Sequence, residues 1–541
     1  MVFGLFVLFY GIILVHVYVI TIKNHDFFLD KAHQQHCTTV NILPERGIII
    51  DRNGHPLALN KKASAAFITP STITHEKELI TFLQKEFPSA LERWQKNPKA
   101  HFMYIDRRLT PEQLNLINGA KIHDIFIIEE PHRLYPLPAA AQLIGITDID
   151  NHGLMGIEFL YDHLLQGKSG IICFEKDARS GNFYFKKEVK VPTTPGQSIQ
   201  LTIDSTLQFL VFQQLKQHIE RVGAQEGSVL IVDPNNGHIL TMAVYPAFDP
   251  NTSGHLTAAH TKNSICTDAY ELGSVMKPFV ALALLEEGLV DDEELIDCKN
   301  SKIAYVQGIR ISTWRAHDKL TFSKIMQSSN NIGIATLALR LGPLLHTHYC
   351  RLGFGIKTSL KWAGQQSGFV NKPDNWSKSS LISLSFGYEI RATLLQLAQA
   401  FCIIARGGTP VSLKLLFEAN SALSQKELLY STQTTEKLIA ILEKTVETGT
   451  GCKAKIAGYK IWGKTGTANL VIDGHYSTEH NLYTFAGVIQ NESYGRLIIT
   501  FIKDVGRGDA YASTIAAPLF NQVAQIVLIN DKMIMNNEKI F

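Results

Sequence analysis

The first 22 residues form an apolar run, and residues 2–22 carry no Asp, Glu, Lys or Arg. As a helix at 1.5 Å per residue this run spans about 31 Å, which matches the hydrocarbon core of a bilayer. A cleavable signal peptide would have a shorter apolar core followed by small residues, and residues 23–30 offer no such site. The pattern predicts an uncleaved transmembrane anchor at residues 1–22, and the alternative is a buried core helix.

A second pattern, without sustained periodicity, follows from about residue 37. Short strand-like runs such as 47–50 alternate with polar helical stretches at 76–86 and 89–96, and Gly and Pro interrupt the whole region. The composition changes at Pro-Thr-Thr-Pro-Gly, residues 192–196. We therefore expect a mixed domain at 37–195 and a second domain at 196–541, as a chain of this length predicts.

The pattern becomes regular in the second domain. Residues 198–203 alternate like a strand, and Asp204 is placed to cap a helix over 205–221. A hairpin follows, and its strands are 227–233 and 238–244. Three more strands are expected late in the chain, and mostly helical sequence lies between the two groups; these strands are 459–462, 482–490 and 496–503. One sheet shared by both ends and covered by a helical block is an α+β fold.

Composition narrows the function only slightly. The chain is 45% hydrophobic and 19% charged, and its net charge of +3 is spread without a basic block, which disfavours nucleic acid as a partner. Its seven cysteines are scattered and form no CxxC pair, so we expect free thiols. His33, His36 and Cys37 have a passing resemblance to metal ligands, but no further Cys/His cluster completes a tetrahedral set, and neither metal nor cofactor is predicted.

The candidate chemistry begins at Ser274-Val-Met-Lys277, which precedes an apolar helix. If the helix starts at the serine, Ser274 and Lys277 lie on one face, and Pro278 falls near the first turn, where a missing N–H costs least. A neutral lysine amine can take the proton of a serine hydroxyl, provided that burial or nearby positive charge lowers its pKa. Alone, this motif is weak, and an ordinary capping serine explains it as well.

Two further motifs strengthen the case. Residues 327–333 (Gln-Ser-Ser-Asn-Asn-Ile-Gly) interrupt a helical pattern begun at Thr321, where local capping is the simpler explanation. Residues 463–468 (Gly-Lys-Thr-Gly-Thr-Ala) follow the strand begun at Tyr459, and a solvated turn is the simpler explanation there. Glycine in a strand often marks close approach of another backbone or a ligand, and the lysine and threonines beside it can bind a carboxylate. All three motifs in this order are the signature of active-site serine penicillin-recognising enzymes.

The chain resembles a class B penicillin-binding protein over essentially its whole length. No glycosyltransferase-like region fits in the N-terminal half, and Tyr270-Glu271 and Ser329-Asn-Asn331 resemble the septal, division-specific group. Six further segments are similar to family motifs of the juxtamembrane, pedestal and transpeptidase regions: Arg46–Gly54 with Leu57-Ala58, Gly153–Glu158, Leu165–Lys168, Asp177-Ala-Arg179, Leu201–Asp204 with Leu207-Gln208, and Gly449-Thr-Gly451. The resemblance implies a transmembrane helix, a pedestal (dimerisation-like) domain at 37–195 and a transpeptidase domain at 196–541 with an antiparallel sheet.

The resemblance also implies residue roles and a reaction. Ser274 would attack the penultimate D-alanine of a stem peptide, Lys277 would take its proton, and Ser329 and Asn331 would relay a proton and hold Lys277 and the substrate amide. The terminal carboxylate would meet the third motif, which consists of Lys464, Thr465, Gly466 and Thr467. Backbone N–H groups of Ser274 and Thr467 would form the oxyanion hole. Neighbouring stem peptides would be cross-linked, and beta-lactams would be covalent inhibitors.

Location and partners follow from the same resemblance. Lys23 and Lys31 after the apolar run would place the domain in the cytoplasm by the positive-inside rule, but the substrate exists only outside the inner (cytoplasmic) membrane. We therefore expect a single-pass protein whose catalytic domain faces the periplasm or exterior. Membrane lipid, a glycan polymerase and other division proteins are the expected partners.

Two departures from the family and two alternatives remain. Leu272 stands where proline is usual and would loosen the turn before the nucleophile, and Glu389 stands where glycine is common and would place a charge near the cleft. One alternative is a carboxypeptidase or beta-lactamase of the same fold, which the anchor and pedestal disfavour. The other is a non-catalytic scaffold or beta-lactam sensor, which the intact motifs disfavour.

Overall fold

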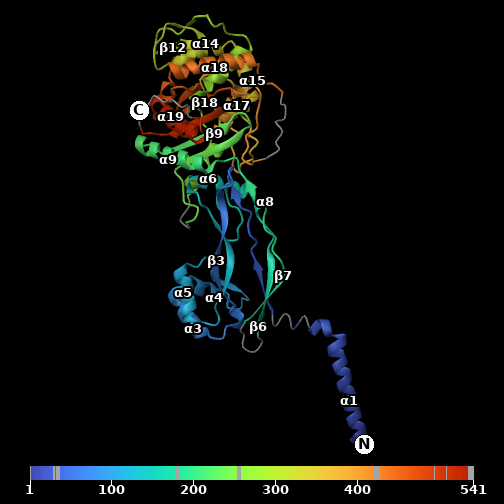
Figure 1. Ribbon diagram of the computed structural model, residues 1–541. Coiled ribbons are helices and arrows are strands. Elements are labelled where there is room, and N and C mark those ends of the chain that lie inside the picture. Colours follow the sequence, from blue (N-terminus) through green and yellow to red (C-terminus); the bar gives the residue numbers. More distant parts are fainter. Residues whose placement is uncertain are drawn as a thin grey trace.

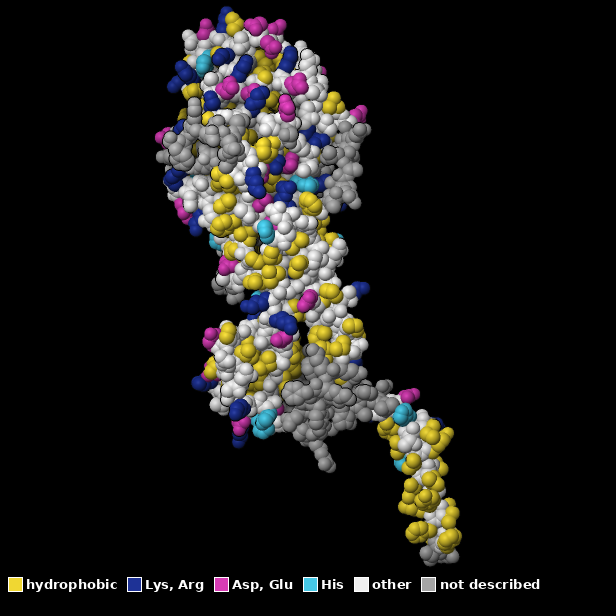
Figure 2. Space-filling view, in the orientation of Figure 1, with side chains coloured by type: hydrophobic (Ala, Val, Ile, Leu, Met, Phe, Trp, Pro, Cys, Tyr) yellow, Lys and Arg dark blue, Asp and Glu magenta, His cyan; other side chains and the backbone are white. Residues whose placement is uncertain are grey.

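The computed structural model describes residues 2–28, 31, 37–100, 102–176, 183–252, 257–417, 427–492, 494–506 and 509–533. At the N-terminus, α1 (Val2–Tyr18) continues into a π-helical turn, η1 (Val19–Lys23). The segment Phe3–Lys23 is long and apolar enough to cross a bilayer, and none of it is buried (Figures 1 and 2). This is the behaviour expected of an anchor and not of a core helix. The segment Ala512–Asn530 is also long and apolar enough to cross a bilayer, but it packs inside the C-terminal domain.

The region after the anchor contains two sheets, which extend from the globular C-terminal domain toward the N-terminal helix (Figure 1). A three-stranded sheet has the order β1-β6-β7, and a second sheet has the order β4-β3-β2-β8 with β5 also paired to β3. The strands are β1 (Cys37–Ile42), β2 (Ile49–Ile50), β3 (Pro56–Ile68), β4 (Met103–Asp106), β5 (Phe126–Leu134), β6 (Gly170–Lys176), β7 (Phe183–Val191) and β8 (Ile199–Gln200).

Helices close the pedestal at both ends of the long strand β3. Helices α3 (Glu76–Glu86), α4 (Pro88–Lys96) and α5 (Pro111–Ala120) pack a small core around Leu83 and Trp94. Pro88 occupies the first turn of α4, where its missing N–H leaves no bond unmade. Three short helices lie at the other end, and they are α6 (Ala141–Ile144), α7 (Gly156–Leu160) and α8 (Asp162–Leu165).

A buried ion cluster explains the family motifs at 46–54 and 153–158. Arg46 Nε donates to Glu158 Oε2 at 2.6 Å, and Arg133 Nε donates to the other oxygen, Oε1, at 2.7 Å. All three side chains are at most 2% exposed. Arg46 Nη1 also donates to Asp162 of α8 at 2.7 Å. Because a buried charge without its partner is costly, this cluster fixes the juxtamembrane segment to the end of the pedestal that adjoins the C-terminal domain (Figure 1).

Asp51 joins the same juxtamembrane segment to the C-terminal domain. Its Oδ2 accepts from the N–H and hydroxyl of Ser205, at 3.0 and 2.7 Å. Its Oδ1 accepts from the N–H groups of Asn53 and His55. Burial raises the pKa of Asp51, but these hydrogen bonds outweigh burial, and the net effect is a lowered pKa. Ser205 begins α9 (Ser205–Val222), so the pedestal motif and the first helix of the next domain share one carboxylate.

The C-terminal domain is built on one antiparallel sheet, with the strand order β10-β9-β19-β18-β17. Its members are β9 (Glu226–Asp233), β10 (His238–Tyr245), β17 (Ile461–Ile472), β18 (His475–Gln490) and β19 (Gly495–Lys503). Strands from both ends of the domain therefore share one sheet, as the sequence predicts. Two of the late strands are longer than predicted, because β17 and β18 extend into an exposed hairpin at residues 470–480.

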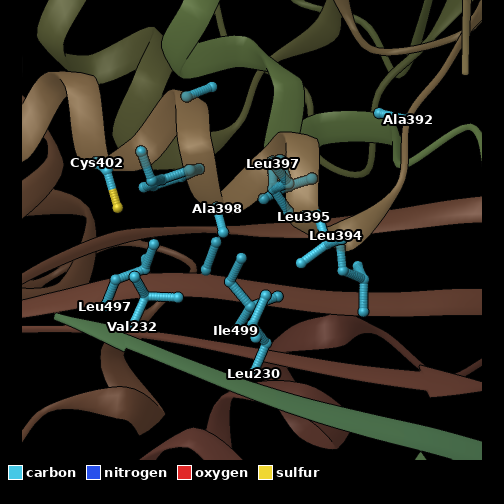
Figure 3. Close-up of a cluster of buried hydrophobic side chains, with 14 of the residues drawn as sticks. Leu230, Val232, Ala392, Leu394, Leu395, Leu397, Ala398, Cys402, Leu497 and Ile499 are labelled. Carbon is cyan, nitrogen blue, oxygen red and sulfur yellow. The ribbon is translucent and has the colours of Figure 1, made fainter. Parts of the chain in front are cut away.

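Both faces of this sheet are buried because alternate residues point to opposite sides. Val229 and Ile231 of β9 face a core shared with α9 and α19 (Ala512–Asn530), whereas Leu230 and Val232 face the helical block. Figure 3 shows α17 (Leu394–Ala405) above the sheet, with its apolar side chains directed at β9 and β19. Asp204 caps α9 by accepting from Leu207 N–H at 3.0 Å, as predicted.

The helical block lies between β10 and β17 in the sequence. It contains α10 (Ala258–Thr261), α11 (Ser264–Thr267), α12 (Lys277–Glu286), α13 (Phe322–Ser328), α14 (Asn331–Ala338), α15 (Leu344–Arg351), α16 (Ser380–Ser385), α17 and α18 (Thr432–Glu447). The same part of the chain also contains three two-stranded sheets. They are formed by β11 (Ile296–Asp297) with β14 (Lys319–Leu320), β12 (Ile303–Val306) with β13 (Ile309–Ser312), and β15 (Phe369–Val370) with β16 (Ile390–Arg391). The α+β class is thus confirmed.

Two expectations change. The strand predicted at 198–203 reduces to β8, because beyond it Leu201 forms only an isolated bridge with Leu416 and Thr202 N–H donates to the Leu415 carbonyl. The prediction of free thiols is wrong for Cys173, which is disulfide-bonded. It holds for Cys266, Cys298, Cys350, Cys402 and Cys452. Residues 33–36 and the Asp177-Ala-Arg179 motif lie outside the described residues, and among the described residues no group of three or more His, Cys, Asp or Glu could hold a metal ion.

Candidate active site

The nucleophile candidate lies on a tight turn before a buried helix. Ser274 sits in a 3-10 turn, η4 (Gly273–Met276), and α12 begins only at Lys277. The sequence predicted an α-helix starting at the serine, so the helix start is three residues later than expected. Gly273 has φ +63°, and a Cβ there would lie 2.6 Å from the Thr467 carbonyl oxygen. This position therefore requires glycine for both its backbone conformation and its space.

Lys277 is fully buried beneath the turn. Its Nζ donates to the Ser329 carbonyl at 2.7 Å, to Ser329 Oγ at 3.1 Å and to Asn331 Oδ1 at 2.7 Å. Burial, and next the charge of Lys464, hold the pKa of Lys277 well below its usual range. A depressed pKa favours the neutral amine, which is the form that can accept a proton from a hydroxyl.

The second motif turns sharply between α13 and α14. Ser329 has φ +54° and is buried, and Asn331 is the first residue of α14. Asn330 caps α14, because its Oδ1 accepts from Gly333 N–H at 2.8 Å. Ser328 Oγ instead donates to the Lys324 carbonyl. The structure therefore brings Ser329 and Asn331 to Lys277, whereas Ser328 and Asn330 serve the local backbone.

The third motif lies in the middle of β17 and is no solvated turn. Lys464 is fully buried, and its Nζ donates to Ser329 Oγ at 2.9 Å and to the Thr465 carbonyl at 3.0 Å. Burial lowers the pKa of Lys464 to about 7. One hydroxyl, Ser329 Oγ, thus lies within hydrogen-bonding distance of the amines of Lys277 and Lys464.

The rest of the third motif contacts neighbouring loops. Thr465 Oγ1 pairs with Thr450 Oγ1 at 2.9 Å, and Thr467 Oγ1 accepts from Ala512 N–H at 3.0 Å. A Cβ at Gly466 would lie 2.6 Å from the Leu272 carbonyl oxygen and 2.9 Å from the Val275 nitrogen. The strand glycine does mark a close backbone approach, and the backbone that approaches is the turn that carries Ser274.

The two departures from the family have structural partners. Leu272 is 1% exposed and packs in the main core, so it is held firmly and does not leave the turn loose. Glu389 has φ +57°, and its carboxylate accepts from Asn371 Nδ2 at 2.6 Å. Its N–H donates to Glu271, three residues before Ser274, at 2.8 Å. The Glu389 carboxylate is therefore held in place by a side-chain amide.

Sequence reasoning missed the segment that supports the second motif. Asn331 Nδ2 donates to the Ser312 carbonyl at 2.8 Å, and Trp314 Nε1 donates to the Ser328 carbonyl at 2.6 Å. Backbone carbonyls carry no sequence signal. A single exposed tryptophan after a short strand carries little, because its partner lies in another element.

Comparison with known proteins identifies the family. The model of the penicillin binding protein transpeptidase domain matches residues 227–525, more than half of the chain, and that of the penicillin-binding protein dimerisation domain matches residues 41–201. The chain belongs to the class B penicillin-binding proteins. This penicillin-binding protein carries its three motifs, at 274–277, 329–331 and 464–467, inside the transpeptidase match.

Curated relatives and solved structures agree. The probable peptidoglycan D,D-transpeptidase PbpC of Pseudomonas aeruginosa is 30% identical over 93% of this penicillin-binding protein and 89% of PbpC. FtsI of Buchnera aphidicola is 31% identical over 92% and 89%, and FtsI of Escherichia coli K12 is 29% identical over 93% and 86%. Penicillin binding protein 3 of Mycobacterium tuberculosis, in complex with aztreonam, has the same fold, with a TM-score of 0.70 at 23% identity over 92% of this chain and 98% of that one.

Proposed function

We propose that this protein is a septal peptidoglycan D,D-transpeptidase that works through an acyl-enzyme on Ser274. The observation that carries the proposal is the buried Lys277 amine, which lies one turn from Ser274 and contacts Ser329 and Asn331. Relatives named peptidoglycan D,D-transpeptidase, among them FtsI, support the reaction and the septal role.

Each residue of the site has a role in this proposal. Neutral Lys277 takes the proton of Ser274 as its Oγ attacks the penultimate D-alanine carbonyl, and the terminal D-alanine leaves. Ser329 passes a proton toward the departing amine, because its hydroxyl lies 3.1 Å from Lys277 Nζ. Asn331 holds Lys277 at 2.7 Å and binds the substrate amide. An amine of a neighbouring stem peptide then attacks the acyl-enzyme, which forms the cross-link and frees Ser274.

The third motif binds the terminal carboxylate through Thr465, Gly466 and Thr467. Lys464 contributes mainly its charge, because its Nζ is buried and directed at Ser329 and Thr465. The N–H groups of Ser274 and Thr467 form the oxyanion hole, which is usually the largest electrostatic contribution to acyl transfer.

We further propose a single-pass topology with the catalytic domain outside the cytoplasmic membrane. The substrate is outside, and the disulfide at Cys173 is typical of oxidising compartments. The domain division at residues 195 and 196, membrane lipid, and a glycan polymerase and division proteins as partners belong to this proposal. The pedestal would hold the site above the membrane and meet those partners.

Labelling with a fluorescent penicillin tests the proposal. We expect one labelled peptide, carrying the adduct on Ser274, and no label on Ser274→Ala. Ser328→Ala is the matched control, because its hydroxyl bonds only the Lys324 carbonyl, and it should label like the wild type. A stem pentapeptide substrate analysed by mass spectrometry then separates cross-linked product from the trimmed product of a carboxypeptidase. A folded protein that is never acylated would contradict the proposal.

A further inference from the structure

The hairpin of β12 and β13 continues into a segment that lies against the second motif. This segment, residues 312–314, makes three contacts with the turn at 328–331. The Ser312 carbonyl accepts from Asn331 Nδ2 at 2.8 Å, and Thr313 Oγ1 lies at a long 3.5 Å from Asn331 N. Trp314 Nε1 donates to the Ser328 carbonyl at 2.6 Å.

The Trp314 contact completes the C-terminal end of α13. The last four carbonyls of a helix lack partners within it and must find them elsewhere. The Ile325 and Met326 carbonyls accept from the N–H groups of the next turn, Asn330 and Ser329. The Gln327 carbonyl accepts from Thr450 N–H at 3.2 Å. The Ser328 carbonyl, the last of the four, accepts from the indole of Trp314.

The position of this carbonyl matters because Ser329 follows it in the left-handed conformation. A non-glycine residue at φ +54° is held there only by its surroundings. If the Ser328 peptide rotates, the carbonyl and hydroxyl of Ser329 move relative to Lys277 Nζ. Trp314 is 49% exposed, so burial of its ring accounts for only part of what Trp314 contributes to holding this turn.

We propose that Trp314 is a positioning residue for acylation, which acts by fixing the Ser328 carbonyl and through it the Ser329–Asn331 turn. Water can hydrate a carbonyl that has lost its indole partner, but a mobile water does not fix the direction of the peptide. Loss of the donor should therefore slow chemistry more than it weakens folding. This inference rests on the proposed function, because acylation is its readout.

The test compares three variants of the full chain with a fluorescent penicillin. Trp314→Phe keeps an aromatic ring and removes the donor. Trp314→His restores a donor, because Nε2 of histidine occupies the same place in its five-membered ring as Nε1 of tryptophan. The matched control is Trp376→Phe, which removes an indole N–H that donates to the Asn371 carbonyl at 2.9 Å, away from Lys277 and Ser329.

We expect Trp314→Phe to lower the limiting acylation rate constant about tenfold, as the loss of one well-placed hydrogen bond implies. The penicillin concentration at half-maximal rate should stay within about twofold, since this contact acts on positioning. Trp314→His should recover much of the rate, and Trp376→Phe should acylate like the wild type. Melting temperatures of all variants report folding.

The outcomes separate the two proposals. A wild-type protein that is never acylated overturns the proposed function and this inference with it. A wild-type protein that is acylated, together with a folded Trp314→Phe of unchanged rate, overturns this inference alone. If Trp314→Phe does not fold, the acylation rate constant of Trp314→His tests the inference instead, and a rate far below the wild type would overturn it. Equal slowing in both Trp314 variants also overturns the inference, because the N–H would then not be the group that matters.

Discussion

Gly466→Ala would test whether β17 sets the position of the nucleophile. The added Cβ would stand 2.6 Å from the Leu272 carbonyl oxygen, 2.8 Å from Val275 Cβ and 2.9 Å from the Val275 nitrogen. These atoms belong to the backbone or are fixed to it, so no side-chain rotation relieves the contact. The turn η4 and strand β17 must separate.

The size of the separation follows from the contact distance. An ordinary contact starts near 3.4 Å, so the Leu272 carbonyl must retreat by about 0.8 Å. Overpacking of this kind costs about 1–3 kcal/mol of stability. A misplacement on the order of 1 Å can cost about 100-fold in rate, because the hydroxyl and its base lose their alignment. We therefore expect acylation of Ser274 to fall about 100-fold in a protein that still folds.

The assay measures the acylation rate constant with a fluorescent penicillin, together with the urea-unfolding free energy. Gly487→Ala in β18 is the matched control, because its Cβ would meet the ring of Phe485 at 2.7 Å, near α19 and away from the nucleophile turn. Both variants should lose stability, and only Gly466→Ala should lose rate. Equal rates in the two variants would refute the idea that β17 positions Ser274 through this contact.

Three further changes probe the base, the charge and the pedestal. Lys277→Ala should slow acylation by about 10²–10⁴-fold through loss of the general base, whereas the exposed Lys453→Ala should label normally in the same gel assay. Because the pKa of Lys464 is about 7, its ammonium loses its proton as pH rises through that value, so penicillin affinity measured across this range should decline toward alkaline pH; a flat profile would contradict the assigned charge. Arg46→Ala should lower the unfolding free energy of the pedestal by about 3–5 kcal/mol in a denaturant titration, because it leaves Glu158 buried with one partner fewer. The exposed pair Lys62–Glu129 supplies the contrast, since Lys62→Ala should change stability by less than about 1 kcal/mol.

The sequence predicts those features that depend on local chemistry. Asp204 caps α9 because its side-chain oxygen accepts from a backbone N–H in the first turn of the helix. An aspartate directly before an amphipathic run is a pattern that the sequence alone reveals. The shared sheet is also predictable, since strands at both ends of the domain enclose a helical block, and β9 does pair with the late strand β19. The strand glycine at 466 signals a close approach, although not what approaches.

Features that depend on tertiary contact could not be predicted. The third motif looks like a solvated turn because lysine and threonine are polar, and only pairing with β18 shows that Lys464 is buried within a strand. The disulfide at Cys173 is hidden for the same reason, because only the fold brings two cysteines within the about 7 Å that a disulfide requires. Trp314 gave no signal, since its partner is a backbone carbonyl of another element.

The two buried amines share one hydroxyl, Ser329 Oγ, among their hydrogen-bond partners. Ser329 Oγ lies 3.1 Å from Lys277 Nζ and 2.9 Å from Lys464 Nζ, and two ammonium groups there would repel each other in a site shielded from water. Burial lowers the pKa of both amines, and the charge of Lys464 lowers the pKa of Lys277 further. If Lys277 is neutral and Lys464 is charged, the two N–H bonds of Lys277 can donate to the Ser329 carbonyl and Asn331 Oδ1, and Ser329 Oγ accepts from the Lys464 ammonium. That arrangement leaves Lys277 ready to take a proton from Ser274 while Lys464 retains the positive charge that a carboxylate requires, so the two lysines are not interchangeable although both are buried beside the same oxygen.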